Sequence, residues 1–196
     1  MFSDSSAPFK IERQKISQDG FELCLVSAED IENLTQNFSS NADLNDFFKN
    51  DCLLYEKDLL AKTYKLIYQE KPEIILGLIS LSNDALRFEG RSQRDNNVPH
   101  RKRGLNIFPA VKIGRLAINK EFDGKGLGTF IISLVKKIFL IENRTGCRFI
   151  TVDAYNQHDV LNFYKKNLFV EIKNKDIDKA TLATVSMFYN LQHVKL

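Results

Sequence analysis

The sequence predicts an α/β (α+β) protein with a mixed, mostly antiparallel central sheet of about six or seven strands and about four flanking helices. In the first half, two alternating apolar runs separated by a turn at residues 70–73 predict a β-hairpin. In the second half, strand-like and helix-like runs alternate, which is typical of βαβ units. With 196 residues and 43% hydrophobic residues, the chain suits a polar arm over residues 1–18 and a single domain over residues 19–196.

The individual elements follow from local patterns. Residues 21–27 (FELCLVS) read as a first strand, and a helix opens near Ile31. After a break at residues 39–42, apolar residues at mostly helical spacing predict a second helix over 43–60. The remaining predicted strands are 63–68, 74–81, 111–118, 148–154, 169–172 and 181–189, and the remaining helices are 126–141 and 158–166.

Residues 83–108 contain Gly, Pro, Asn and many charges, and they predict a long basic loop. One interpretation is a solvated surface segment. The other is a contact surface for phosphates or another polyanion. The arginines that would make this substrate contact are Arg87, Arg91, Arg94, Arg101 and Arg103.

The strand over residues 111–118 contains a break in its alternation. Val111 and Ile113 point one way, whereas Leu116 and Ile118 are out of phase with them, and the slip falls at Gly114. A glycine at a slip suggests a β-bulge, which leaves backbone N–H and C=O groups open to a ligand; a simple edge irregularity is the alternative.

A glycine-rich turn, Asp123 to Thr129 (DGKGLGT), leads into the helix over residues 126–141, which carries one continuous apolar stripe. Three glycines at a helix N-terminus cost stability and need a reason. Without Cβ atoms, an anion can approach the unpaired first-turn N–H groups, where the helix dipole is positive. The sequence therefore predicts a phosphate or pyrophosphate site.

The turn lacks the GxxxxGK[ST] of a Walker A loop, and its GxGxG spacing does not fit a dinucleotide-binding GxGxxG. It resembles motif A of the GNAT acetyltransferases, [QR]xxGx[GA], with Asp123 where Gln or Arg is usual. The resemblance implies acetyl-CoA as co-substrate, with the bulged strand contacting the thioester and pantetheine. The implied contacts are Leu116, Ala117, Ile118, Asp123, Gly124, Lys125, Gly126, Leu127, Gly128, Thr129 and, from the second motif, Asn156.

Residues 148–169 resemble the strand–helix–strand of the same family, which ends in an FYxxxGF-like signature with Leu168 in place of the glycine. Asn156 is interpreted as an N-cap, or as a cap that also contacts pantetheine. The resemblance implies that Tyr164 protonates the departing thiolate, and a phenol with a pKa near 10 suits a thiol near 8.5; a buried core tyrosine is the alternative. No general base stands out, and His158 is interpreted as a solvent-facing or capping residue.

Residues 38–68 and the Gly-Arg-Leu-Ala-Ile run at 114–118 resemble toxin acetyltransferases of bacterial toxin–antitoxin pairs, which acetylate the α-amine of aminoacyl-tRNA. That resemblance implies tRNA and an antitoxin as partners. Protein or peptide amines and small-molecule amines stay open as acceptors, as does a homodimer. An acyl-CoA- or partner-binding module without activity is the alternative function, favoured only by the departures at Asp123 and Leu168.

Other classes are disfavoured. Three widely spaced cysteines form no CxxC pair, so we expect neither a disulfide framework nor a zinc site. The N-terminus lacks the apolar region of a signal peptide, and no apolar run approaches the roughly 18 residues of a membrane span. A cytoplasmic protein without membrane association is expected.

Overall fold

The computed structural model describes residues 15–34, 38–102, 104–141, 143, 145–173 and 181–193. Its centre is an eight-stranded sheet with the order β1-β2-β3-β4-β5-β6-β8-β7. Only the β5–β6 pair is parallel among the pairs in this sheet. The predicted mixed, mostly antiparallel sheet is therefore confirmed, with one strand more than the sequence indicated. No helix in the described ranges is long and apolar enough to cross a membrane.

The additional strand lies in the predicted polar arm. Residues 15–18 form β1, which pairs with β2 through a tight turn at Asp19 and Gly20, both with positive φ. The rest of the predicted arm, residues 1–14, lies outside the described residues. The strands are β1 (Lys15–Gln18), β2 (Phe21–Leu25), β3 (Lys62–Tyr68), β4 (Lys71–Arg87), β5 (Ile107–Ile118), β6 (Phe149–Tyr155), β7 (Val170–Glu171) and β8 (Thr184–Asn190).

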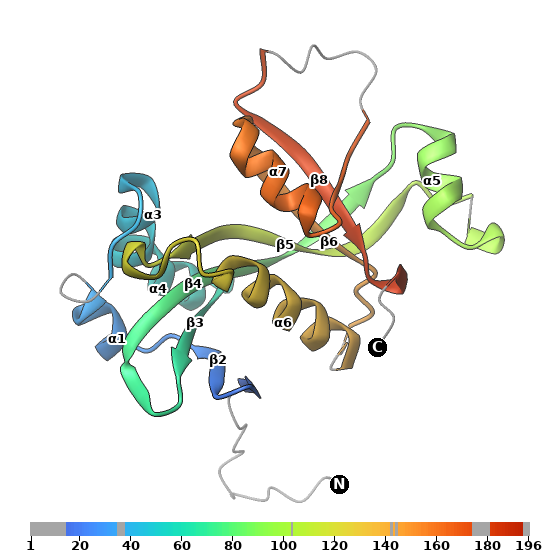
Figure 1. The fold of residues 1–196 in the computed structure, drawn as a ribbon. Coiled ribbons are helices and arrows are strands. Elements are labelled where there is room, and N and C mark those ends of the chain that lie inside the picture. The colour runs from blue at the N-terminus through green and yellow to red at the C-terminus, as the bar shows by residue number, and fades with distance from the viewer. Residues whose placement is uncertain are drawn as a thin grey trace, which may run out of the picture.

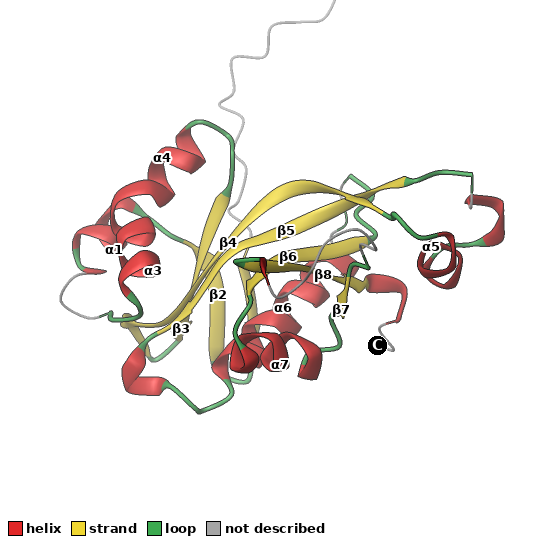
Figure 2. Cartoon of the chain, turned by 90° about the horizontal axis from the view of Figure 1, so that it is seen from above, coloured by secondary structure: helices red, strands yellow, loops and turns green. Residues whose placement is uncertain are grey.

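Helices cover both faces of the sheet, as Figures 1 and 2 show. One face carries the N-terminal helices: α1 (Ala28–Glu32), α3 (Ala42–Asp46) and α4 (Cys52–Lys57). The other face carries α6 (Leu127–Ile141) and α7 (His158–Lys166). The helix predicted over 43–60 is divided by a π-helical turn, Phe47–Asp51, and it ends at Lys57 because Leu59 adopts a left-handed φ of 59°.

The apolar stripe of α6 packs against the sheet as its periodicity predicted. Leu127, Ile131, Leu134 and Val135 are all buried in the largest core cluster. The approach to β4 is close at Gly77, where an added Cβ would lie 2.7 Å from Ile131 Cδ1. This packing fixes the N-terminus of α6 relative to β4 and β5.

The prediction of a long loop over residues 83–108 is wrong. Instead, β4 continues to Arg87, α5 (Arg91–Asn97) follows, and β5 begins at Ile107. We call the described part of residues 83–108 the α5 extension; its helical part, α5, lies beyond the end of the β4–β5 pair (Figure 2). It has an aromatic core that local sequence patterns did not reveal, in which Phe88 makes edge-on ring contacts with Phe108, Phe149 and Phe188.

Leu168 occupies a backbone conformation that favours glycine. It directly follows the C-cap of α7 with φ 66° and is 68% exposed. A left-handed conformation costs a non-glycine residue about 1–2 kcal/mol. The glycine common in related signatures therefore has a backbone reason, and Leu168 keeps the turn at a cost.

We expect Leu168→Gly to raise the free energy of unfolding by up to about 1 kcal/mol, because relief of this strain exceeds the added freedom of the unfolded chain. Urea denaturation measures the change. The matched control is Val170→Gly, which replaces another exposed aliphatic residue but in extended β7, where glycine should destabilise. Equal losses in both variants would contradict the prediction.

Candidate active site

The site begins where two neighbouring parallel strands separate. β5 pairs with β6 only from Ala110 to Ile113. Further along, β5 pairs with β4 alone and β6 with β8 alone. The register between β4 and β5 shifts at this point: Leu81 is opposite Ile113 and Ser80 is opposite Arg115, so Gly114 is the extra residue. The predicted β-bulge is confirmed, and it leaves the facing edges of β5 and β6 apart.

A cavity of about 1230 Å³ lies in this gap and extends to both α6 and α7. It brings together most of the residues predicted from sequence to contact a co-substrate. Lys125 and Asn156 do not line it. The predicted residues that do are Leu116, Ala117, Ile118, Asp123, Gly124, Gly126, Leu127, Gly128, Thr129 and Tyr164.

Glycine occurs at the three positions of the turn for two different physical reasons. Gly124 and Gly126 have φ of 73° and 79°, a region that side chains disfavour. Gly128 instead lies against α7, where an added Cβ would be 3.1 Å from the Phe163 ring. Close approach of an anion was the only reason inferred from sequence. Backbone conformation and helix packing are the reasons that the structure shows.

The turn presents unpaired amides to the cavity. The first helical hydrogen bond runs from the Phe130 N–H to the Gly126 carbonyl at 3.0 Å, so the N–H groups of Leu127, Gly128 and Thr129 precede the first donor and have no acceptor within the helix. These groups lie at the positive end of a 15-residue helix. This arrangement suits a phosphate or diphosphate.

Buried Asn119 anchors the start of the turn, and sequence reasoning missed it. Its side chain donates to the Ile75 carbonyl at 3.2 Å and accepts from the Glu121 N–H at 3.4 Å. Its backbone N–H donates to the Leu76 carbonyl at 2.9 Å. Asn119 thus ends β5 at a fixed point beside β4. Its position as a polar residue directly after a predicted strand was the only sequence feature that could have pointed to this role.

The charged side chains of the turn, Asp123 and Lys125, make contacts within the turn itself. The Asp123 carboxylate accepts a hydrogen bond from the Gly124 N–H at 3.3 Å, so it occupies one amide next to the cavity. Lys125 lies 4.8 Å from the centre of the Phe122 ring, which holds its ammonium group beside the turn. The acid at position 123 therefore has a structural role, and a cation lies close by.

Tyr164 reaches the cavity from the last turn of α7 while being 6% exposed. Its ring lies between Phe163 and Phe169, with centroid distances of 5.1 and 5.4 Å. Burial raises the pKa of the phenol well above its usual value. The hydroxyl is protonated at neutral pH and is a weaker acid than an exposed phenol.

Asn156 and His158 lie outside this group. The N-cap of α7 is Gln157, so the interpretation of Asn156 as the cap is wrong; its side chain instead donates to the Leu182 carbonyl at 3.0 Å. His158 is exposed on the first turn of α7, beside Asp159, and does not line the cavity. The solvent-facing position expected for His158 is confirmed.

On the opposite face of the sheet, two polar groups that sequence reasoning missed meet near the cavity. Tyr155 on β6 donates to the Asp43 carboxylate of α3 at 2.7 Å, and Arg115 of the bulge lies 3.8 Å from the same oxygen. The hydrogen bond to Asp43, with burial, raises the pKa of Tyr155. Tyr155 and Asp43 are 112 positions apart, so no sequence spacing could have joined them.

A second charged pair lies beside this group. Lys112 on β5 is 2.5 Å from Asp153 on β6, which also accepts from Ser186 at 2.6 Å. Burial would raise the pKa of Asp153, but the hydrogen bonds from Lys112 and Ser186 outweigh it and hold that pKa below its usual value. Asp153 is therefore a charged, paired group at neutral pH and a poor proton acceptor.

The predicted substrate arginines differ from one another. Arg94 is largely buried, where it pairs with Asp95 at 3.0 Å and donates to Asn106 at 2.8 Å. Arg87, Arg91 and Arg101 are exposed and form no ion pair with a described residue. Arg103 lies outside the described residues. The α5 extension therefore carries a structural arginine and three exposed ones.

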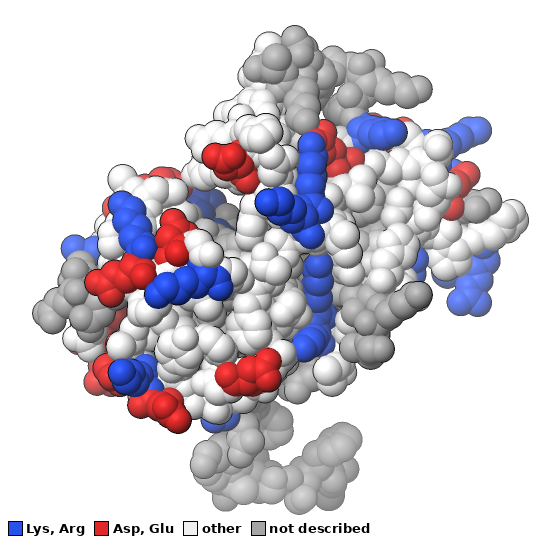
Figure 3. Space-filling model, viewed as in Figure 1, with Lys and Arg blue, Asp and Glu red and all other residues white. Residues whose placement is uncertain are grey.

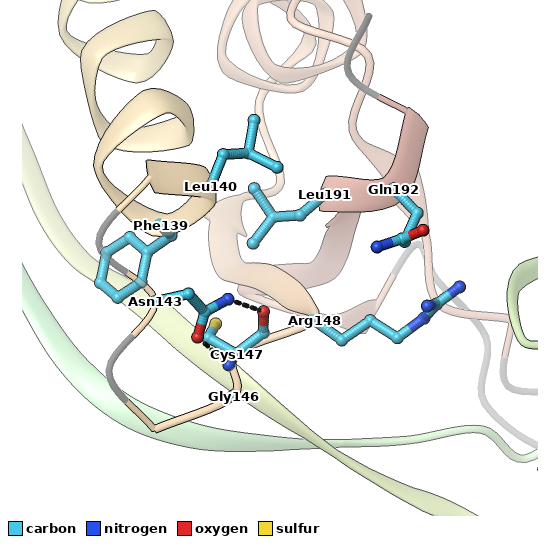
Figure 4. Close-up of a pocket in the computed structure, with 8 residues that line it drawn as sticks. All are labelled: Phe139, Leu140, Asn143, Gly146, Cys147, Arg148, Leu191 and Gln192. Carbon is cyan, nitrogen blue, oxygen red and sulfur yellow. Dashed lines mark hydrogen bonds between the residues drawn. The ribbon is translucent and has the colours of Figure 1, made fainter. Parts of the chain in front are cut away.

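A smaller hollow of about 280 Å³ lies at the other end of α6 (Figure 4). There the Asn143 side chain folds back on Cys147, accepting from its N–H at 2.5 Å and donating to its carbonyl at 2.6 Å. Burial raises the pKa of the Cys147 thiol to about 11, so it is no nucleophile at neutral pH. These contacts close the turn between α6 and β6.

No protein-family model matches the sequence, and no curated protein matches it. Solved structures do match the fold. A crystal structure of a KacT mutant is 18% identical, covers 89% of this chain and 96% of its own, and gives a TM-score of 0.69. AtaT complexed with acetyl-methionyl-tRNAfMet is 16% identical, covers 88% of this chain and 95% of its own, and gives a TM-score of 0.68. AtaTR bound with AcCoA is 18% identical, covers 89% of this chain and 96% of its own, and gives a TM-score of 0.59.

These similarities span most of both chains, so the predicted GNAT fold is confirmed. Within that class, the fold is that of the AtaT and KacT structures, as the toxin acetyltransferase resemblance predicted. Identities below 20% in these three comparisons carry the fold to this chain and nothing finer.

Proposed function

We propose that this chain is an acetyl-CoA-dependent N-acetyltransferase whose acceptor is the α-amine of aminoacyl-tRNA. The observation that carries the activity is a single cavity shared by the gap between β5 and β6, the glycine-rich turn and Tyr164. AtaTR has been solved with AcCoA, and this chain has the same fold. An acyl-CoA-binding module would not need a buried phenol at the cavity.

The residues of the cavity have separable tasks. The amides of Leu127, Gly128 and Thr129 bind the diphosphate. Backbone groups on the free edge of β5, from Leu116 to Ile118, align the pantetheine and polarise the thioester carbonyl. After the amine attacks the carbonyl and the C–S bond breaks, the Tyr164 hydroxyl gives its proton to the thiolate.

An α-amine suits this site better than a lysine side chain does. Its pKa of about 8 leaves a useful fraction neutral at pH 7, whereas lysine near 10.4 needs a proton acceptor. Asp153, an acidic group that lines the cavity beside the bulge, is already paired with Lys112 and Ser186. The site thus favours an amine that deprotonates without help.

The α5 extension supports a polyanionic acceptor. Arg87, Arg91, Arg101 and Lys102 are exposed there without ion pairs to described residues. Figure 3 shows Lys and Arg side chains on both sides of this end of the molecule. AtaT has been solved with acetyl-methionyl-tRNAfMet. We propose that these cations contact phosphates of tRNA, and that an antitoxin partner restrains a cytoplasmic toxin.

The test is transfer of radiolabelled acetyl groups from acetyl-CoA to bulk aminoacyl-tRNA, with uncharged tRNA, a lysine-containing peptide and a polyamine as competing acceptors. We expect label on aminoacyl-tRNA only. Label on the peptide or the polyamine would replace the tRNA assignment. Acetyl-CoA binding without transfer to any acceptor would favour the binding module.

The phosphate contacts predict a salt effect. Arg91→Ser combined with Arg101→Ser should weaken tRNA binding about tenfold near 0.1 M salt and lower the slope of log K against log salt by about 2. Filter binding at several salt concentrations measures both. The control, Lys57→Ser with Lys71→Ser, removes two exposed cations elsewhere, one of them at the opposite end of β4. Equal effects from both double variants would indicate non-specific charge attraction.

A further inference from the structure

The cavity is lined by residues from both faces of the sheet, and we call its two sides the first and the second opening. On one face it is lined by α6, α7 and the glycine-rich turn. On the other face it is lined by Ser40, Asn41 and Leu44 at α3, with Lys112, Arg115 and Tyr155 on the strands. Under the proposed function the diphosphate occupies the first opening, next to the amides of Leu127, Gly128 and Thr129, which leaves the second opening for the other reactant.

Tyr155 and Arg115 line the cavity on this side, and both contact Asp43 of α3, which neighbours the lining residue Leu44 but does not line the cavity itself. The Tyr155 hydroxyl donates to Asp43 Oδ2 at 2.7 Å, and Arg115 Nε lies 3.8 Å from the same oxygen. Arg115 is itself held by its contact with the Phe47 ring at 5.1 Å and by its hydrogen bond to the Gly114 carbonyl at 3.0 Å. The orientation of the Asp43 carboxylate is therefore fixed from two sides.

Only one of the two oxygen atoms of the Asp43 carboxylate has a partner in the described part of the chain. Both contacts are made to Oδ2, and no described residue donates a hydrogen bond to Oδ1. The Asp43 side chain is 57% exposed. Arg115 Nε is buried and forms no hydrogen bond with the described residues. A buried donor without a hydrogen bond is costly, and a small movement of α3 toward the bulge would satisfy it.

We propose that Asp43, aligned by Tyr155 and Arg115, binds the ammonium form of the acceptor amine and determines the specificity of this opening. This inference rests on the proposed acetyltransferase function. The open Oδ1 offers a charge-assisted hydrogen bond to an ammonium group, which is stronger than a bond between neutral groups. The bound ammonium then loses one proton to water before its nitrogen attacks, so Asp43 is a positioning residue.

Asp43→Asn tests the proposal with bulk aminoacyl-tRNA as the acceptor. We expect the acceptor KM to rise about tenfold at pH 6.5, where the α-amine is protonated, and less than threefold at pH 8.5, where it is mostly neutral. The KM for acetyl-CoA should stay within twofold. Tyr155→Phe should give a smaller rise with the same pH trend, because the carboxylate remains but loses its alignment.

Asp46→Asn is the matched control. Asp46 lies on the same helix and accepts a hydrogen bond from the Asn50 side chain at 2.7 Å, whereas Asp43 accepts one from Tyr155, which lines the cavity. The same loss of charge there should leave both KM values unchanged. A rise in KM that is equal at pH 6.5 and 8.5 would indicate a merely structural role and overturn the inference.

The outcomes separate the two proposals. If the wild-type chain transfers acetyl groups and Asp43→Asn has a wild-type acceptor KM at pH 6.5, this inference fails and the proposed function stands. If the wild-type chain transfers no acetyl group to aminoacyl-tRNA, the proposed acceptor fails and the inference fails with it.

Discussion

Tyr164→Phe should lower kcat about 100- to 1000-fold, the contribution expected of a positioned general acid. The variant removes only the hydroxyl oxygen, and the ring keeps its contacts with Phe163 and Phe169. The dissociation constant of CoA should therefore stay within twofold. Thiol release from acetyl-CoA gives kcat, and calorimetry gives the CoA affinity.

Tyr189→Phe is the matched control, because Tyr189 is an equally buried tyrosine of the same core that does not line the cavity. It should keep wild-type turnover. Because burial raises the pKa of Tyr164, its deprotonation should not reduce turnover below about pH 10. Wild-type turnover in Tyr164→Phe would remove the general-acid role.

Gly126→Val should raise the dissociation constant of acetyl-CoA at least tenfold, and up to about a hundredfold if one or two charge-assisted hydrogen bonds of about 1.5–3 kcal/mol are lost. Gly126 has φ 79°, and a Cβ there would meet no atom within 4 Å. A Cβ at this position therefore meets no clash, but valine disfavours the backbone conformation that directs the amides.

Gly146→Val separates binding from stability. Gly146 has the same φ of 79° and an equally open surrounding, but it lies in the α6–β6 turn at the other end of α6 (Figure 4). Both variants should lose similar unfolding free energy, about 1–2 kcal/mol or more. Only Gly126→Val should lose CoA affinity. Equal CoA affinities would mean that the glycine-rich turn does not bind the diphosphate.

The strand–turn–helix at the centre of the site could be predicted because its signals are local. The slip at Gly114 and the stripe from Leu127 to Val135 fall within one short stretch of chain. Side-chain alternation and helical periodicity depend on neighbours two to four residues apart, so a single sequence shows them. The bulge and the buried face of α6 follow directly.

Other features could not be predicted because they depend on residues far apart in the chain. The ordered α5 extension is stabilised by Phe149 and Phe188, which lie in later strands, so residues 83–108 alone resemble a loop. The Tyr155–Asp43 hydrogen bond joins the two halves of the chain. Local charge and glycine content describe the solvation of a segment, and they do not show which distant strand covers it.

Because of its aromatic core, the backbone of the α5 extension loses its conformational entropy when the chain folds, and not when a ligand binds. Phe149 begins β6, and Val152 and Ala154 of the same strand line the cavity. Because Phe88 of the extension packs against Phe149, β6 connects the extension to the cavity lining, in an arrangement that is set when the chain folds. A mobile basic loop would have to lose about 1–2 kcal/mol of backbone entropy for each residue that it orders on an incoming nucleic acid. Under the proposed function this loss precedes binding, because the extension is already folded and holds its exposed cations at a set distance from the cavity.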